Sequence, residues 1–554
     1  MDDTAAEPMV DAALGAAGAA EAAEAAEARR PGTSTTRALA RAGLIVTFLF
    51  LLSRILGYVR TLAIAAAVPV DQLGPFFAAF RIPDFLFQLV AAGALSSALI
   101  PVIAALFAKD EEAWAWRVVS TVTTLMLSGL LVLAAVVLVV APQLVAFIAP
   151  GFDANELAQT TQLTRIMVLS PLFLAAGAVA TSALNAKGRF AAAGMAPLVY
   201  NLMIILGALF LVPVFGIPGL AYGVVAGAIG HVLVQVPSLW RIGARIVPRV
   251  DLRDAQARTA LLLMVPRAIG LGATQVVFLV MTSLATTLGD EALAVFNFAF
   301  TLLQIPIGVI GVPLGVVLLP SLAREAATGG TEAFRRLLTR GLSILAYVMI
   351  GIAALGIVVS EDVVRLLFDF AHISETAIKA TSLTLAVFLV GLTAHSLIAV
   401  LARAFYALQD TKTPVIAALL AVFINIVVAN ALVGSMGLQG LAVAIAVAAW
   451  LETLTLVVLL ERRVDGLSMR HVWVVMLKSA IVTGAGALVA LGVERVLQGA
   501  WGADPGFLLL LARTSLAVGA GGLVIVAGSR ALRIEELGTI VGLVVDLIRR
   551  RGRA

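Results

Sequence analysis

Long apolar stretches separated by short polar segments recur along nearly the whole chain. Most of them hold about 20 residues, enough for an α-helix to cross the roughly 30 Å hydrocarbon core of a membrane. Alanine, leucine and valine follow one another without the apolar–polar alternation that a strand of a membrane β-barrel requires. The pattern therefore predicts an all-α polytopic membrane protein with about 14 transmembrane helices.

The composition excludes a soluble globular fold. Apolar residues make up 61% of the chain, mean hydropathy is +1.06 and only 13% of residues are charged, against roughly 25% in soluble domains. Cysteine is absent, which excludes disulfides and thiolate metal sites, and the four histidines are too scattered for a zinc motif. Since the sequence has no glycine-rich nucleotide loop, catalytic triad spacing or metal cluster, we expect no enzyme activity, metal or cofactor.

Basic residues collect in every second connection between spans, as the positive-inside rule expects of a cytoplasmic face. They are Arg29, Arg30, Arg37, Arg41, Lys187, Arg189, Arg241, Arg245, Arg249, Arg253, Arg258, Arg335, Arg336, Arg340, Arg462, Arg463 and Arg470. Most of the intervening connections are acidic, as at Asp71, Asp153 and Glu156. This distribution predicts that both termini are cytoplasmic. Topology and anionic lipid headgroups explain the net charge of +5, so nucleic-acid binding is not implied.

Short matches at a nearly constant offset indicate an internal duplication. At offsets of 223 and 224 residues, Arg81-Ile82-Pro83 matches Gln304-Ile305-Pro306, and Ala183-Leu184-Asn185 with Asn201 matches Ala407-Leu408-Gln409 with Asn425. Six spans return the chain to the same side, so we expect two six-helix lobes related as parallel repeats around a central cavity, working by alternating access. The predicted lobes are residues 39–250 and 251–465, and two extra C-terminal helices occupy 466–532.

The two ends of the chain differ from the spans. Residues 1–38 form an acidic Ala/Glu-rich tract without the apolar core of a secretory signal, so we expect a disordered cytoplasmic tail. Residues 533–554 place Ile540, Val544 and Ile548 at helical spacing before a closing arginine cluster. That pattern is typical of an amphipathic helix on the cytoplasmic leaflet or of a simple membrane anchor.

Two arginines inside the first predicted span carry the strongest functional signal. Arg54, Gly57 and Arg60 fall within a sector about 120° wide on one helix, so both guanidinium groups can address one cavity. Arg54 lies about 18 Å past the cytoplasmic entry near Ala42, close to the bilayer midplane. A permanent charge at that depth requires a partner, water or an anionic substrate. Arg60 lies nearer the outer surface, where snorkelling is the alternative.

Further charged residues in spans extend the candidate cavity site. Arg81 and Asp84 are three residues apart in the second span, where they form either an internal ion pair or a substrate contact. Arg267 follows Pro266 in the seventh span, where a kink can turn its guanidinium inward and supply a cation from the second lobe. Several arginines around a cavity select phosphates or pyrophosphates, which accept paired guanidinium hydrogen bonds.

Three more ionisable residues, His231, His395 and Glu452, are candidates for ion or proton coupling. The alternative for each is a hydrogen-bonded contact between helices. Arg403, Lys478 and Arg513 lie within snorkelling reach of a membrane interface, so we expect structural roles for them.

Six motifs along the chain resemble one known family. They are Ser-Arg-Ile-Leu-Gly-Tyr-Val-Arg at 53–60, Phe-Phe-Ala-Ala-Phe-Arg-Ile-Pro-Asp at 76–84, Gly-Ala-Leu-Ser at 93–96, Gly-Arg-Phe at 188–190, Ile-Pro-Ile-Gly-Val-Ile-Gly-Val at 305–312 and Phe-Tyr-Ala-Leu-Gln-Asp-Thr-Lys-Thr-Pro at 405–414. In this order the motifs are similar to those of the MurJ (MviN) lipid II flippases, members of the multidrug/oligosaccharidyl-lipid/polysaccharide (MOP) exporter superfamily.

The resemblance implies fourteen helices in two lobes, with an additional pair forming a lipid-tail groove, in the bacterial cytoplasmic membrane. It implies export of lipid II, the undecaprenyl-pyrophosphate-linked peptidoglycan precursor, from the inner to the outer leaflet. Lipid II and membrane lipids are the implied partners, with cell-wall synthesis proteins as possible further ones. Arg54 and Arg60 match the two family arginines of the first helix that line the cavity.

Several positions depart from the family pattern. Phe87 stands where the family has an arginine, and Thr301 stands at the family arginine of the eighth span, so we hypothesise that Arg267 compensates for one missing cation. Gly74, Thr61 and Gln304 replace acidic residues of the family. Export of another undecaprenyl-linked glycan and ion-coupled multidrug export are the alternative functions, although drug exporters typically need an acidic cavity. A membrane scaffold without transport is the third alternative.

Overall fold

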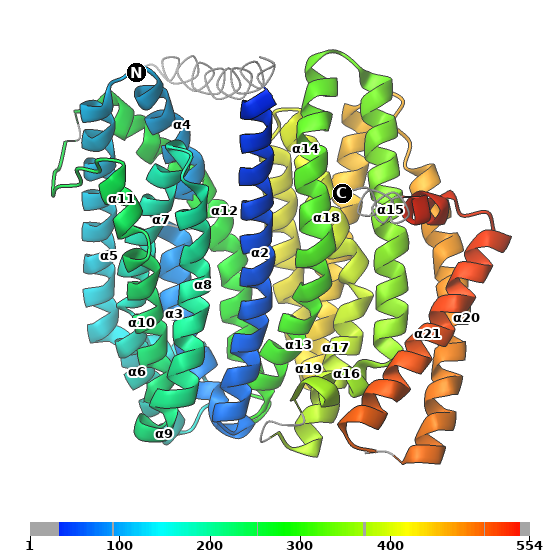
Figure 1. The fold of residues 1–554 in the computed structure, drawn as a ribbon. Helices are drawn as coiled ribbons and strands as arrows, with labels where there is room; N and C mark the ends of the chain where they lie inside the picture. Colours follow the sequence, from blue (N-terminus) through cyan, green and yellow to red (C-terminus); the bar gives the residue numbers. More distant parts are fainter. Residues whose placement is uncertain (1–32, 91–93, 252, 369–372, 503–504, 543–554) are drawn as a thin grey trace. The chain divides into compact units, whose positions relative to one another are not determined.

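A computed structural model describes residues 33–90, 94–251, 253–368, 373–502 and 505–542 (Figure 1). Within these ranges, side chains are described from residue 48 onward, except at 90, 94–98, 263, 265–271 and 273–274. All regular structure in the described residues is helical, which confirms the predicted all-α class. The acidic tract at 1–32 and the closing arginine cluster at 549–553 lie outside the described residues.

The chain divides into two compact units. The first contains residues up to Ile64, Ala78–Ala146 and Ala154–Gln275, and the second contains Ala65–Phe77, Phe147–Asp153 and the chain from Val276 onward. Two short segments of the first half therefore pack with the second unit. The lobe boundaries proposed from the sequence stay predictions.

The first unit holds most or all of each of a set of α-helices that pack closely through small residues. They are α2 (Thr33–Ala67), α3 (Leu73–Val90), α4 (Ala94–Ala108), α5 (Glu112–Ile148), α6 (Ala154–Met167), α7 (Ser170–Ala186), α8 (Phe190–Leu206), α9 (Val212–Phe215), α10 (Pro218–Leu233), α11 (Val236–Arg241) and α12 (Ala255–Thr286), with a π-helical turn η3 at Gly207–Leu211. The ends of α2, α5 and α12 and the start of α3 belong to the second unit. α10 packs against α7, α8 and η3. A Cβ on Gly207 would lie 2.7 Å from the Cα of Gly223, so only glycine allows η3 and α10 to approach this closely.

The second unit contains the remaining helices. They are α13 (Ala292–Pro306), α14 (Val312–Ala327), α15 (Thr331–Val358), α16 (Ser360–Phe368), α17 (Glu375–Val390), α18 (Leu392–Ala407), α19 (Lys412–Arg463), α20 (Arg470–Trp501) and α21 (Phe507–Ala531), with short turns η2 (Val70–Gln72) and η4 (Ile307–Gly311). α18 packs against α14, α15 and α19, and α17 packs against α13 and α19. Phenylalanines of α13 fill part of this core, among them Phe296 and Phe298, each 1% exposed.

Ten helices among the described residues are long and apolar enough to cross a membrane, and α17 with α18, bent by 44°, makes an eleventh span. α19 is interrupted at Gly437 and so holds two of the predicted spans. The α3–α4 pair and α12 occupy the positions of the remaining two. This arrangement is consistent with the predicted count of about fourteen.

The same tight backbone turn occurs once in each half. Gly216 has φ 65° and ψ −151°, and Gly437 has φ 56° and ψ −132°, conformations that are open mainly to glycine. A Cβ on Gly219 would lie 2.4 Å from the backbone eight residues earlier, and a Cβ on Gly440 would lie 2.7 Å from the backbone eight residues earlier. The chain therefore doubles back at both places. Gly216 and Gly437 are 221 residues apart, as are Gly219 and Gly440, an offset two to three residues shorter than that of the sequence matches.

The last two spans, α20 and α21, pack side by side along their length (Figure 1). A buried ion pair ties α21 to α16. Nε of Arg513 donates to Oδ2 of Asp362 at 2.9 Å, Nη2 of Arg513 donates to Oδ1, and the Thr514 hydroxyl donates to Oδ2 at 3.0 Å. The side chains of Arg513 and Asp362 are 3% and 2% exposed. Arg513 thus has the structural role expected, but it is buried and paired instead of snorkelling to an interface.

The described part of the C-terminal tail packs on protein. Residues 535–542 are helical, and Ile534 and Leu537 are buried in one cluster with Tyr347, Val475, Val482 and Ile525. Ile540, one of the three apolar residues at helical spacing, packs against the same cluster, and the other two, Val544 and Ile548, lie outside the described residues. The beginning of the tail is therefore held by α15, α20 and α21.

Candidate functional site

Arg60 and Asn201 connect the first span to α8. Nη1 of Arg60 donates to Oδ1 of Asn201 at 3.0 Å, and Nδ2 of Asn201 donates to the backbone carbonyl of Ser53 at 3.5 Å. Asn201 is 7% exposed, and Gly57 faces it at van der Waals distance. One amide side chain therefore satisfies a guanidinium and a backbone carbonyl of α2 together, in an environment where unpaired polar groups are costly.

Arg54 has a different environment on the same helix. Its side chain is exposed in the described structure, and its guanidinium carbon lies 5.2 Å from the centroid of the Phe50 ring, one turn earlier on α2. Among the described side chains, no carboxylate lies within ion-pair distance of Arg54. This cation is accessible to an anionic ligand, and the aromatic ring beneath it offers a favourable cation–π contact.

Arg81 and Asp84 interact electrostatically on one face of α3, as their spacing predicts. The Asp84 carboxyl also accepts hydrogen bonds from Gln88, one turn along α3, and from Gln275 of α12, and it is close enough to Arg60 to interact with that charge. Tyr200 of α8 lies near Arg60 and Asp84. The two charges therefore interact along one helix, and contact of Arg81 or Asp84 with a substrate stays a prediction.

Arg60, Arg81, Asp84 and their neutral neighbours form one polar cluster within the first unit, built from α2, α3, α8 and α12. Arg60 and Arg81 bring two positive charges and Asp84 brings one negative charge, which leaves an excess of one positive charge, and Arg54 is a separate exposed cation on α2. At membrane depth such an excess favours binding of a multiply charged anion and disfavours cations. Guanidinium groups suit phosphate oxygens because they can donate paired hydrogen bonds.

Arg267 is the cation that the sequence predicts for the cavity from the second lobe. Arg267 belongs to α12, but its side chain lies outside the described residues, so the hypothesis that it compensates for missing family cations stays a prediction. Phe87 is partly buried on α3. Thr301 donates its hydroxyl to the backbone carbonyl of Asn297 at 2.8 Å, a bond within α13.

His231 makes a contact between helices. Its ring hydrogen bonds to the backbone of Ala196 and packs directly on Gly177, where a Cβ would lie 2.2 Å from the ring. Gln235, one turn later, donates to the Gly177 carbonyl at 3.2 Å and accepts from the Thr181 hydroxyl at 3.0 Å. α7, α8 and α10 are thus joined here through polar bonds, the alternative considered for this histidine.

His395 and Glu452 lie in the second unit. His395 follows Gly391, the bend between α17 and α18, and its Nε2 is buried without a hydrogen-bond partner among the described residues. Glu452 is partly buried on α19 and has no ion pair among the described residues. Their role in ion coupling stays a prediction. In the described part of the chain, no three His, Asp or Glu side chains are grouped as a metal site would require.

Sequence analysis missed the neutral members of the cluster, which are Gln88, Tyr200, Asn201 and Gln275. Asn201 entered only as a marker of the repeat. A polar amide inside an apolar run was the available signal, since such residues are uncommon in spans unless they hydrogen bond or serve function.

Comparison with known proteins gives consistent results. A family model described as "Lipid II flippase MurJ" matches residues 64–512. A probable lipid II flippase MurJ of Rhizobium tropici is 32% identical over 426 residues, covering 74% of this chain and 79% of the relative. A lipid II flippase MurJ of Burkholderia cenocepacia is 30% identical over 437 residues, covering 77% of this chain and 84% of the relative.

Solved structures show the same fold. A lipid II flippase MurJ in an inward closed conformation aligns with a TM-score of 0.72 at 20% identity and covers 88% of this chain and 99% of its own. An inward-facing multidrug resistance MATE family transporter of the MOP superfamily aligns with a TM-score of 0.66 at 14% identity, covering 76% of this chain and 98% of its own. Since the family model spans most of the chain and the relatives are similar over most of their length, the chain belongs to the lipid II flippase MurJ family.

Proposed function

We propose that this chain exports lipid II from the inner to the outer leaflet of the bacterial cytoplasmic membrane. Membership of the family supports the substrate, and the cationic cluster of the first unit supports the chemistry. The single observation that carries the mechanism is Arg54, an accessible cation in an apolar span with no carboxylate partner among the described residues. Both termini face the cytoplasm in this proposal, because basic residues mark every second connection.

In the proposed mechanism the pyrophosphate of the substrate binds the arginines of the first span. Arg54 contacts it directly, because its N–H donors are accessible. Arg60 is oriented by Asn201, so that part of its guanidinium is engaged and the rest is presented in a fixed direction. Alternating access of the two lobes then moves the headgroup across the membrane while the polyprenyl tail stays in lipid.

Complementation tests this function. In cells depleted of their own MurJ, the wild-type chain should restore growth and shape, and Arg54→Ala should fail and let lipid II accumulate on the cytoplasmic leaflet. Arg253→Ala, which removes an exposed arginine from the connection before α12, is the control and should complement. Normal growth with Arg54→Ala at wild-type expression would contradict the mechanism.

The alternatives give different outcomes in the same cells. A flippase for another lipid-linked glycan would fail to complement even as wild type, and a multidrug exporter would instead raise drug resistance. The similarity to MATE transporters supports the fold alone, and an exposed arginine without a carboxylate partner among the described residues, as at Arg54, is unsuited to cationic drugs.

A further inference from the structure

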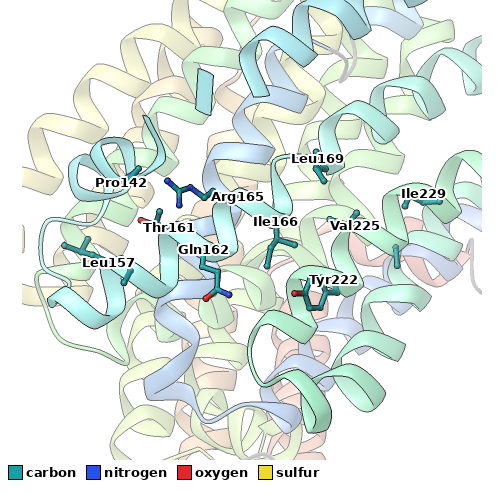
Figure 2. A pocket seen from close by; sticks show the side chains of 12 residues that line it. Pro142, Leu157, Thr161, Gln162, Arg165, Ile166, Leu169, Tyr222, Val225 and Ile229 are labelled. Carbon is teal, nitrogen blue, oxygen red and sulfur yellow. The ribbon is translucent and has the colours of Figure 1, made fainter. Parts of the chain in front are cut away.

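A groove on the first unit lies apart from the cationic cluster. Its volume is about 1060 Å³, and it is lined by the end of α5, by α6 and by α10 (Figure 2). Leucine, isoleucine, valine, alanine and proline make up most of its surface, and Leu169 and Tyr222 beside it are 42% and 40% exposed. All three helices belong to membrane-span candidates, so the groove faces the hydrocarbon of the bilayer or its boundary.

One arginine interrupts this apolar surface. Arg165 of α6 is exposed, and its Nε donates to the backbone carbonyl of Leu138 on α5 at 3.2 Å. This bond fixes the guanidinium at the groove while leaving its terminal N–H groups available. No carboxylate lies within ion-pair distance of Arg165 among the described residues. In Figure 2 the guanidinium lies beside Thr161, and Ile166 and Val225 line the apolar part further along.

The depth of Arg165 matches the phosphate region of a leaflet. α5 has 37 residues and is therefore about 55 Å long, which exceeds a 30 Å hydrocarbon core by about 12 Å at each end if the helix is centred. Arg165 lies eleven residues into α6, or about 16 Å from the same end of the bundle. Its Cα is thus a few Å inside the hydrocarbon boundary, and its side chain reaches the phosphates.

We propose that this groove is a binding site for an anionic glycerophospholipid of the outer leaflet. The lipid phosphate accepts hydrogen bonds from the free N–H groups of Arg165, and an acyl chain lies along the apolar walls formed by α6 and α10. Thr161, Gln162 and Tyr222 offer polar groups for the glycerol and ester oxygens. Arg165 is the sole cation among the described lining residues, which suits one phosphodiester charge better than the pyrophosphate of a polyprenyl lipid.

The test measures lipid retained by the full-length protein. Purified from membranes into mild detergent, the wild type should keep phosphatidylglycerol through washing, as counted by native mass spectrometry. Arg165→Gln should reduce that retention about tenfold or more, since one charge-assisted contact is lost. Arg253→Gln, with the same charge change outside the groove, should retain lipid as the wild type does.

A second variant distinguishes loss of the lipid site from misfolding of Arg165→Gln. Ala226→Trp fills the groove from α10 and leaves Arg165 in place, and it should displace the same lipid. Added phosphatidylglycerol should restore bound lipid to the wild type, and phosphatidylcholine should not. Equal retention of phosphatidylglycerol by the wild type, Arg165→Gln and Ala226→Trp would overturn the proposal without bearing on lipid II export. Loss of a polyprenyl pyrophosphate instead of phosphatidylglycerol on Arg165→Gln would also overturn it, because the groove would then hold a polyprenyl lipid.

Discussion

Asp410 stabilises the start of α19 through several bonds at once. Its carboxylate accepts hydrogen bonds from the backbone N–H of Lys412 at 3.1 Å, the backbone N–H of Thr413 at 3.0 Å and the Thr413 hydroxyl at 2.7 Å. Arg463, at the other end of α19, lies 3.8 Å from the same carboxylate. Asp410 lies one residue before the N-cap, Thr411, and its bonds compensate unpaired N–H groups at the helix start as a capping side chain does.

Replacing this carboxylate should give a pH-dependent loss of stability. Partial burial raises the pKa of Asp410, but the bonds from Thr413 and the charge of Arg463 outweigh it and lower the pKa below its usual value. The stabilisation is therefore complete above the usual aspartate pKa of about 4 and is lost as pH falls through the folded value. We expect Asp410→Ala to cost about 1 kcal/mol at pH 7.

Thermal unfolding in detergent measures this effect. The difference in Tm between the wild type and Asp410→Ala should shrink as pH falls from 7 to 3. Asp465→Ala, at an exposed position that makes no hydrogen bond or ion pair with the described residues, should show little difference at any pH. A difference that grows on acidification would refute the capping role.

At the scale of single residues, the sequence revealed charges better than it revealed their partners. Ionisable residues that interrupt apolar runs could be identified directly, and these are Arg54, Arg60, Arg81 and Asp84. The partner of Arg60 is 141 residues away, and only the packing of α2 on α8 brings the two together. Spacing along one helix predicted the interaction of Arg81 with Asp84 because that contact is local.

At the scale of elements, one buried ion pair joins α21, the last span, to α16. Asp362 and Arg513 are both almost fully buried, and Gly502 adds its carbonyl as an acceptor for Nη1 of Arg513 at 3.1 Å. Removing one partner of such a pair leaves a buried charge uncompensated, which costs more than removing both.

Substitutions of this pair should therefore be strongly non-additive. We expect Arg513→Met alone, or Asp362→Leu alone, to destabilise the protein by about 3–5 kcal/mol, and the double variant to recover much of that loss. Arg530→Met, an exposed change on the same helix, is the control. Equal and additive Tm losses in the two single variants would mean that the pair contributes no coupling.

At the scale of the whole molecule, the first half contributes two short segments to the second unit. Gly74, in the first of these segments, lies so close to the connection before α13 that a Cβ there would be 3.2 Å from the carbonyl oxygen of Asp290. Gly151, in the other segment, donates its N–H to the Thr286 hydroxyl at 3.4 Å. These segments continue directly into α2, α3 and α5, so movement of those helices must either carry or break the contacts.

A reversible cross-link tests whether the contacts break during transport. The chain has no cysteine, so Gly74→Cys with Asp290→Cys introduces the sole pair of thiols. If alternating access separates the segment around Gly74 from the connection before α13, oxidation should stop lipid II export in vesicles and a reductant should restore it. Either single cysteine variant should be insensitive to oxidant. Full export by the oxidised double variant would exclude separation at this place.

The helical class could be predicted because bilayer thickness fixes the length of each apolar run. The count of about fourteen spans is consistent with the structure, and the division into two repeated lobes stays a prediction. The turns at Gly216 and Gly437 were missed, since a glycine in a span is ordinarily explained by close packing. The role of Asp362 was equally hidden, because nothing local marks an aspartate as the partner of an arginine in the last span.

The buried pair of Asp362 and Arg513 also constrains how the protein is made. Asp362 is synthesised before Arg513, which follows it by 151 residues. Its carboxylate therefore reaches the translocon before the guanidinium does. Left alone in lipid, that arginine would oppose insertion of the final hairpin. Insertion of α21 is therefore coupled to correct assembly of the helices before it. In a chain misassembled around α16, α21 would not insert stably into the membrane.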